Sequence, residues 1–126
     1  MLKQILLVAA GGAAGSALRH LVVVGCTRLF GMSFPWGTMT VNIAGSFAMG
    51  VLIEVLARRF DMSMELRLLL ATGFLGGFTT FSSFSLDAVS LFERGYALLA
   101  LAYVLGSVLT GIAALVGGLF LIRALA

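Results

Sequence analysis

The stretch that decides the fold of this chain is Gly73-Phe74-Leu75-Gly76-Gly77-Phe78-Thr79-Thr80-Phe81-Ser82-Ser83-Phe84-Ser85. It lies within an uncharged run, 68–86, that is long enough to cross a bilayer. A continuous spanning helix has no need of three glycines, five hydroxyls and four phenylalanines in thirteen residues. Because lipid tolerates a break in the backbone only where protein buries it or a cavity adjoins it, the stretch predicts a functional site at the membrane midplane.

The composition of the whole chain supports this membrane setting. Of its 126 residues, 61% are hydrophobic and only 10% are charged, whereas a soluble domain averages about 25% charged residues. We therefore expect an all-α integral membrane protein with a single domain, residues 1–126, in contact with the lipid bilayer. The net charge of +3 comes from eight scattered basic residues, which act on membrane topology and do not form a nucleic-acid surface.

The side chains that most enzymes use are scarce. Cys26 is the only cysteine and His20 the only histidine, so the chain lacks the material for a His/Cys metal site or a Ser-His-Asp triad. We therefore expect a protein that is not an enzyme. The lone cysteine also excludes a disulfide within the chain.

Charged residues divide the chain into four predicted spanning helices. We place them at about 3–28, 36–56, 66–92 and 96–122, with the third broken near Gly76-Gly77. The charged segment 58–65 is expected to be an aqueous loop. The predicted side with both termini carries five basic residues against three on the other side. This bias slightly favours cytoplasmic termini and is compatible with insertion in both orientations.

Small residues recur four positions apart in every predicted span: Gly11 and Gly15, Ser46 and Gly50, Gly73 and Gly77, Ser107 and Gly111. Such pairs let helices approach closely in lipid, so we expect these helices to pack against protein. Four short helices enclose a pore with difficulty. A transport function would therefore favour an oligomer.

A polar face runs along the second predicted span. Thr38, Asn42, Gly45 and Met49 follow helical spacing, and Asn42 is the costly member because an amide in hydrocarbon needs hydrogen-bond partners. Two interpretations of Asn42 stay equally open at this point. The amide either holds two helices together or lines a path for a polar solute.

Polar and aromatic residues also share faces in the other two spans. Tyr103, Ser107 and Thr110 predict a polar track in the fourth span, with packing as the alternative, and Phe81 and Phe84 are i, i+3 neighbours in the third. Acidic residues fall in loops or near helix ends: Glu54, Asp61, Glu65, Asp87 and Glu93. Hydroxyls, an amide and positive ring edges suit an anion, so an anion path is favoured over a cation path.

With these residues in hand, the chain resembles the CrcB/Fluc family of fluoride channels over essentially its whole length. Two motifs carry the resemblance: the stretch 73–85 in the third span, and Pro35-Trp36-Gly37-Thr38-Met39-Thr40-Val41-Asn42-Ile43-Ala44-Gly45 in the second. Ser83 stands where the family more often has threonine, and Asp87 where members often carry glutamate. The first change keeps the hydroxyl and the second keeps the charge.

The resemblance implies a dual-topology homodimer in the inner (plasma) membrane, whose two subunits insert in opposite orientations and pass fluoride along two antiparallel pathways. It also implies a central Na⁺ that is not transported and that the backbone carbonyls of Gly76 and Thr79 bind at the helix break. The implied pathway residues are Asn42, Phe81, Phe84, Tyr103 and Ser107, and helical spacing alone adds Thr110. Supporting roles are expected for Arg19, Thr38, Thr80, Ser82, Ser83 and Ser85.

Two other functions are alternatives to this interpretation. A small multidrug/H⁺ exporter is also a four-helix membrane protein, but it would need a carboxylate in the middle of the first span, where this chain has Arg19 and no acid. A scaffold subunit without transport would explain the glycines, but not the hydroxyl track together with a broken helix.

Overall fold

The computed structural model describes residues 1–59 and 63–126, and it contains four helical spans that are long and apolar enough to cross a membrane. The first, second and last are α1 (Leu2–Phe30), α2 (Trp36–Arg59) and α6 (Ala97–Leu125). The third consists of α3 (Met64–Arg67), the π-helix η1 (Leu68–Leu75), α4 (Gly76–Phe78) and α5 (Phe81–Glu93). The described residues form no strand, so the all-α prediction is confirmed. The predicted aqueous loop falls partly on residues 60–62, outside the described residues.

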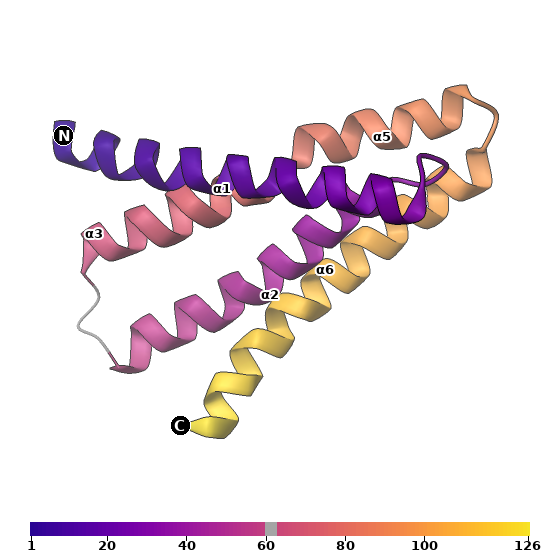
Figure 1. The fold of residues 1–126 in the computed structure, drawn as a ribbon. Coiled ribbons are helices and arrows are strands. Elements are labelled where there is room, and N and C mark those ends of the chain that lie inside the picture. Colours follow the sequence, from indigo (N-terminus) through magenta and orange to yellow (C-terminus); the bar gives the residue numbers. More distant parts are fainter. Residues whose placement is uncertain (60–62) are drawn as a thin grey trace.

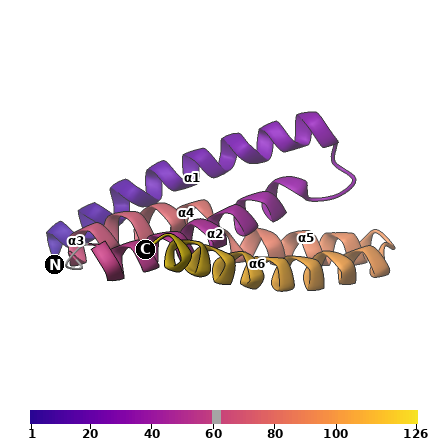
Figure 2. The same ribbon diagram turned by 90° about the horizontal axis from the view of Figure 1, so that it is seen from below.

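The third span changes its neighbours halfway along its length. In Figure 1, α1 runs beside the first half of this span, and α2 runs beside α6. Figure 2 shows α5 and α6 side by side, after the chain has left α1. The interruption of the third span therefore lies where its packing partner changes from α1 to α6.

The helical geometry of the third span is interrupted at Thr79 and Thr80. Thr79 has φ −86° and ψ 158°, and Thr80 has φ −152° and ψ 115°, so both are extended. Gly76 is helical, with φ −62° and ψ −37°. The break predicted near Gly76-Gly77 lies two residues further on, at Thr79 and Thr80, because these glycines still belong to α4. The side chain of Thr80 caps the new helix, and its Oγ1 accepts a hydrogen bond from the N–H of Ser83 at 3.2 Å.

The glycines of α1 and of the third span serve close helix packing instead. A Cβ on Gly15 would collide with the carbonyl oxygen of Phe74, and one on Gly77 would lie 2.6 Å from the carbonyl oxygen of Gly12. The same holds for α2 and α6, where a Cβ on Gly50 would meet the carbonyl oxygen of Leu115. Small residues thus bring backbones into contact, which confirms the packing predicted from their four-residue spacing.

The buried apolar cluster of the molecule lies between α5 and α6 and consists of Phe84, Leu91, Ala100 and Tyr103. Many other large apolar side chains are exposed, among them Phe81, which is 79% exposed. An apolar surface of this extent needs lipid or another protein against it. This agrees with a chain that spans a membrane.

An ion-pair cluster joins α2 to α6 at their C-terminal ends. Glu54 is only 8% exposed. Its Oε1 lies 2.6 Å from Nε of Arg58 and 3.2 Å from Nε of Arg123. The cluster is at the opposite end of α2 from the sequence motif that begins at Pro35, so it fastens two helices without contacting the candidate site.

Candidate functional site

The amide of Asn42 braces the interruption of the third span. Its Nδ2 donates to the carbonyl oxygen of Thr80 at 3.1 Å, and its Oδ1 accepts from the N–H of Thr80 at 2.7 Å. Extended residues lose their helical hydrogen bonds, and a side chain from α2 restores both of them for one residue. One of the two interpretations of Asn42 therefore has direct support, since the amide joins two spans.

Side chains of α1 hold the carbonyl just before the interruption. The oxygen of Gly77 accepts from Nε of Arg19 at 3.0 Å, and the Ser16 hydroxyl lies 3.4 Å from it. Among the described residues, none donates a hydrogen bond to the carbonyl oxygens of Gly76 or Thr79. The two carbonyls predicted to bind Na⁺ therefore have no donor within the described part of the chain, and the same is true of the Phe78 carbonyl between them.

A hard cation fits this set of atoms. Carbonyl oxygens are typical ligands of such cations, and a helix C-terminus carries partial negative charge. The described residues contain no group of three or more His, Cys, Asp or Glu that could hold a metal ion, so backbone oxygens are what this region offers.

A row of aromatic rings crosses from α5 to the segment before α2. The ring centroids of Phe81 and Phe84 are 5.7 Å apart, and those of Phe84 and Tyr103 are 5.1 Å apart. Phe34 continues the row with an edge-on contact to Tyr103 at 5.4 Å. Sequence reasoning missed Phe34, because a phenylalanine in a connecting segment has no periodic pattern. Its position directly before Pro35-Trp36 was the only available hint.

The three residues of the predicted polar track on α6 have different surroundings. Tyr103 is fully buried and its hydroxyl donates to Oδ2 of Asp87 at 3.2 Å. Ser107 has a buried Oγ without a hydrogen-bond partner in the described part of the chain. Thr110 is exposed, and its hydroxyl donates to the carbonyl of Gly106 in its own helix. Tyr103 and Ser107 therefore share an interior environment within this chain, and Thr110 does not.

The supporting hydroxyls lie around the start of α5 and of α2. Thr38 and Thr80 are buried, at 7% and 9% exposure. The Ser82 hydroxyl lies 3.4 Å from that of Thr80, and the Ser85 hydroxyl donates to the carbonyl of Phe81 at 3.0 Å. Ser83 takes part through its backbone N–H, as the residue that Thr80 caps. The cap uses the backbone N–H of Ser83, so it does not require the family's threonine at this position.

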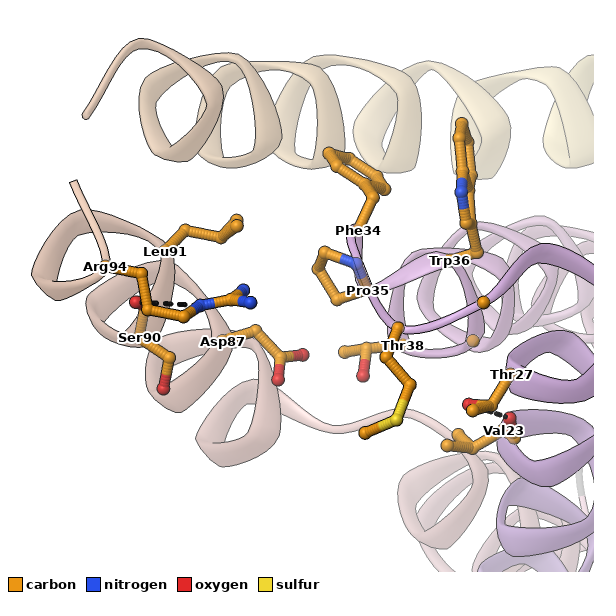
Figure 3. Close-up of a pocket in the computed structure, with 13 residues that line it drawn as sticks. Val23, Thr27, Phe34, Pro35, Trp36, Thr38, Asp87, Ser90, Leu91 and Arg94 are labelled. Atoms are coloured by element: carbon orange, nitrogen blue, oxygen red, sulfur yellow. Dashed lines mark hydrogen bonds between the residues drawn. The ribbon is translucent and has the colours of Figure 1, made fainter. Parts of the chain in front are cut away.

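Two cavities follow the polar face of α2. The first, of about 180 Å³ and drawn in Figure 3, contains Thr38 and opens between α1, α2 and α5. The second, of about 330 Å³, lies against the interruption and is lined by Asn42, Gly45, Ser46, Met49, Thr79, Thr80, Phe81 and Leu115. The four residues predicted to share a face of α2 all line one cavity or the other, and Thr38 and Asn42 are one helical turn apart.

This geometry can place a small polar solute next to hydrogen-bond donors inside a largely apolar protein. Residues 6–119 match the family model described as "CrcB-like protein, Camphor Resistance (CrcB)". The Rhizobium etli protein named "Fluoride-specific ion channel FluC" is 59% identical over 98% of each chain. Proteins of the same name from Chelativorans sp. and Agrobacterium fabrum are 59% and 60% identical over 97% and 95% of this chain and 98% and 96% of their own.

Proposed function

The chain belongs to the CrcB family, and on this premise we propose that it is a fluoride-specific ion channel, as its relatives are named. The observation that carries the proposal is identity of 59% over 98% of both chains with one such relative. Its role would be to let fluoride leave the cell and so to relieve fluoride toxicity. The exporter and the scaffold are the alternatives, and neither receives support from the relatives' names.

Fluoride is small and strongly hydrated, so the pathway must replace its water with donors that also release it. The Ser107 hydroxyl is a donor that no group in the described part of the subunit uses. The Asn42 amide has two N–H groups, and the brace to Thr80 uses one of them. The positive ring edges of Phe81 and Phe84 add an electropositive step beside these donors.

Conduction through this pathway is passive. A membrane potential of about 100 mV is worth roughly 2.3 kcal/mol per charge, which corresponds to about a fiftyfold expulsion of a monovalent anion at equilibrium. No carboxylate is needed for proton coupling, and the acidic residues with described side chains lie within six residues of an end of a spanning segment. The electrical gradient alone is sufficient to drive this expulsion of fluoride from the cell.

We infer that Gly76 and Thr79 hold a structural Na⁺ through their carbonyl oxygens. The absence of donors on these two oxygens supports the inference. The ion would supply positive charge that neutralises the exposed helix end. Arg19 and Ser16 contribute by holding the intervening carbonyl of Gly77, which leaves its neighbours available.

We also propose the dual-topology homodimer of the inner membrane. A single subunit exposes Phe81 and much apolar surface, and four helices alone leave the second cavity open at one side. A second copy in the opposite orientation would cover this surface and double the two carbonyl ligands to four. The weak difference in basic residues between the two ends supports insertion in both orientations.

Reconstituted vesicles test the function directly. Purified protein in liposomes loaded with fluoride should release it within seconds of adding a K⁺ ionophore, as read with a fluoride electrode, and liposomes loaded with chloride should release little. Vesicles that retain fluoride would overturn the proposal. An exporter would instead move an organic cation against a proton gradient, and a scaffold would move neither solute.

A further inference from the structure

The cavity in Figure 3 has a charged residue, Arg94, at its outer end, and Arg94 is not among the proposed pathway residues. Its lining on α5 consists of Asp87, Ser90, Leu91 and Arg94, which are spaced i, i+3, i+4 and i+7 and so occupy one face of the helix. Arg94 follows the last residue of α5, at the end of the span, and Asp87 lies about 10 Å further in by helical rise. The cavity therefore has a cation at the membrane edge and a carboxylate deeper inside.

Arg94 lacks the carboxylate partner that three other cations of the described chain have. Lys3, Arg58 and Arg123 each form an ion pair with a glutamate. Arg94 forms no ion pair with any described carboxylate. Its Nε donates to the carbonyl of Ser90 at 3.4 Å, and its guanidinium carbon lies 5.8 Å from the centroid of the Tyr96 ring, so neither contact uses its terminal N–H groups as hydrogen-bond donors. The terminal N–H groups of its guanidinium therefore stay available to an anion.

The carboxylate inside the cavity already has a partner. Asp87 accepts a hydrogen bond from the Tyr103 hydroxyl at 3.2 Å. Figure 3 shows the side chains of Arg94 and Asp87 extending from α5 toward the side where Pro35 and Thr38 lie. An anion that reaches the mouth meets the guanidinium first and the hydroxyl of Thr38 further along, while the fixed charge of Asp87 opposes its accumulation.

We propose that Arg94 captures fluoride at the mouth of the pathway and that it acts through its charge. This inference rests on the proposed channel function and adds a residue to it. In water, a unit charge about 5 Å away raises the local concentration of an anion roughly fourfold. Salt at 1 M shortens the screening length to about 3 Å and removes most of this gain. Arg94 therefore affects the rate at low fluoride and low salt, and does not affect the maximal rate.

The test compares Arg94→Gln and Arg94→Lys with the wild type in liposomes at constant Na⁺, over a range of fluoride concentrations. Arg94→Gln should raise the fluoride concentration for half-maximal flux roughly fourfold in low salt and leave the maximal flux unchanged. The difference should vanish in 1 M potassium isethionate. Arg94→Lys should behave as the wild type, because it keeps the charge at the end of α5.

The matched control is Arg28→Gln, which removes an equal charge from the last turn of α1 at the same end of the molecule but outside the cavity lining. It should change the half-maximal concentration much less than Arg94→Gln. Equal effects of the two variants, or an Arg94→Lys channel as impaired as Arg94→Gln, would overturn capture by Arg94. A wild-type channel that passes no fluoride would instead overturn the proposed function.

Discussion

Replacement of Asn42 tests whether one amide both braces the broken span and serves the ion path. Asn42→Ala removes the acceptor of one backbone hydrogen bond and the donor of another, at 2.7 Å and 3.1 Å. A buried polar group left unsatisfied costs about 1–3 kcal/mol. Two such groups on Thr80 give an expected loss of about 2–6 kcal/mol of stability. Asn42→Asp keeps the acceptor, but it turns an oxygen toward the carbonyl of Thr80 and adds a negative charge.

The assay measures stability and transport on the same preparation. Thermal unfolding in detergent gives the stability, and fluoride release from liposomes gives the transport. Both variants should melt at lower temperature, and both should lose most fluoride flux, since the break positions the pathway. Gly25→Ala is the control, because no atom lies within 4 Å of the added Cβ, and it should change neither quantity appreciably.

The two variants distinguish the loss of the hydrogen bonds to Thr80 from the addition of a negative charge. If Asn42→Ala conducts normally while Asn42→Asp does not, the added negative charge explains the loss, and the brace has no part in conduction. If flux is abolished while the melting temperature of both variants equals that of the wild type, Asn42 acts as a pathway donor alone. Either result would refute the reasoning that the amide holds the interruption in place.

Three further substitutions have expected outcomes. Ser107→Ala removes a buried hydroxyl without a partner, so stability should stay equal or rise by up to about 1 kcal/mol while fluoride flux falls. Gly15→Val should destabilise the fold by about 2–3 kcal/mol through backbone collision, whereas Gly25→Val, with no atom near its Cβ, should be tolerated in thermal unfolding. Glu54→Gln should lower the melting temperature more than Glu93→Gln, because it leaves two guanidinium groups without their carboxylate.

The spans and their faces could be predicted from the sequence because the signals are local. Hydropathy and charge fix the four spans, and the observed ends lie within three residues of the predicted ones. Helical spacing correctly placed Thr38 and Asn42 on one face of α2, beside two cavities. A periodic pattern within one helix needs no knowledge of any other helix, so it can be read without a structure.

Spacing was less informative on α6, where the neighbours change along the helix. Tyr103 packs against Phe84 of α5, whereas Thr110 lies seven residues further on and is exposed. The two positions share a helix face but have different surroundings. Helical periodicity predicts the direction in which a side chain points, but only the tertiary arrangement decides whether that side chain is buried.

The position of the interruption depends on more than the third span itself. Two glycines in sequence suggest the weakest point of a helix, yet Gly77 is needed for contact with α1 and remains helical. The chain leaves the helix where Asn42 can replace the lost hydrogen bonds of Thr80, and the Thr80 side chain can cap the next helix. A side chain of α1 binds the carbonyl of Gly77, and a side chain of α2 binds the carbonyl of Thr80. The neighbouring carbonyls of Gly76 and Thr79 are thereby held in position without accepting a hydrogen bond themselves. A span that broke at the glycines would lack these partners, so the neighbouring helices select the site of the break.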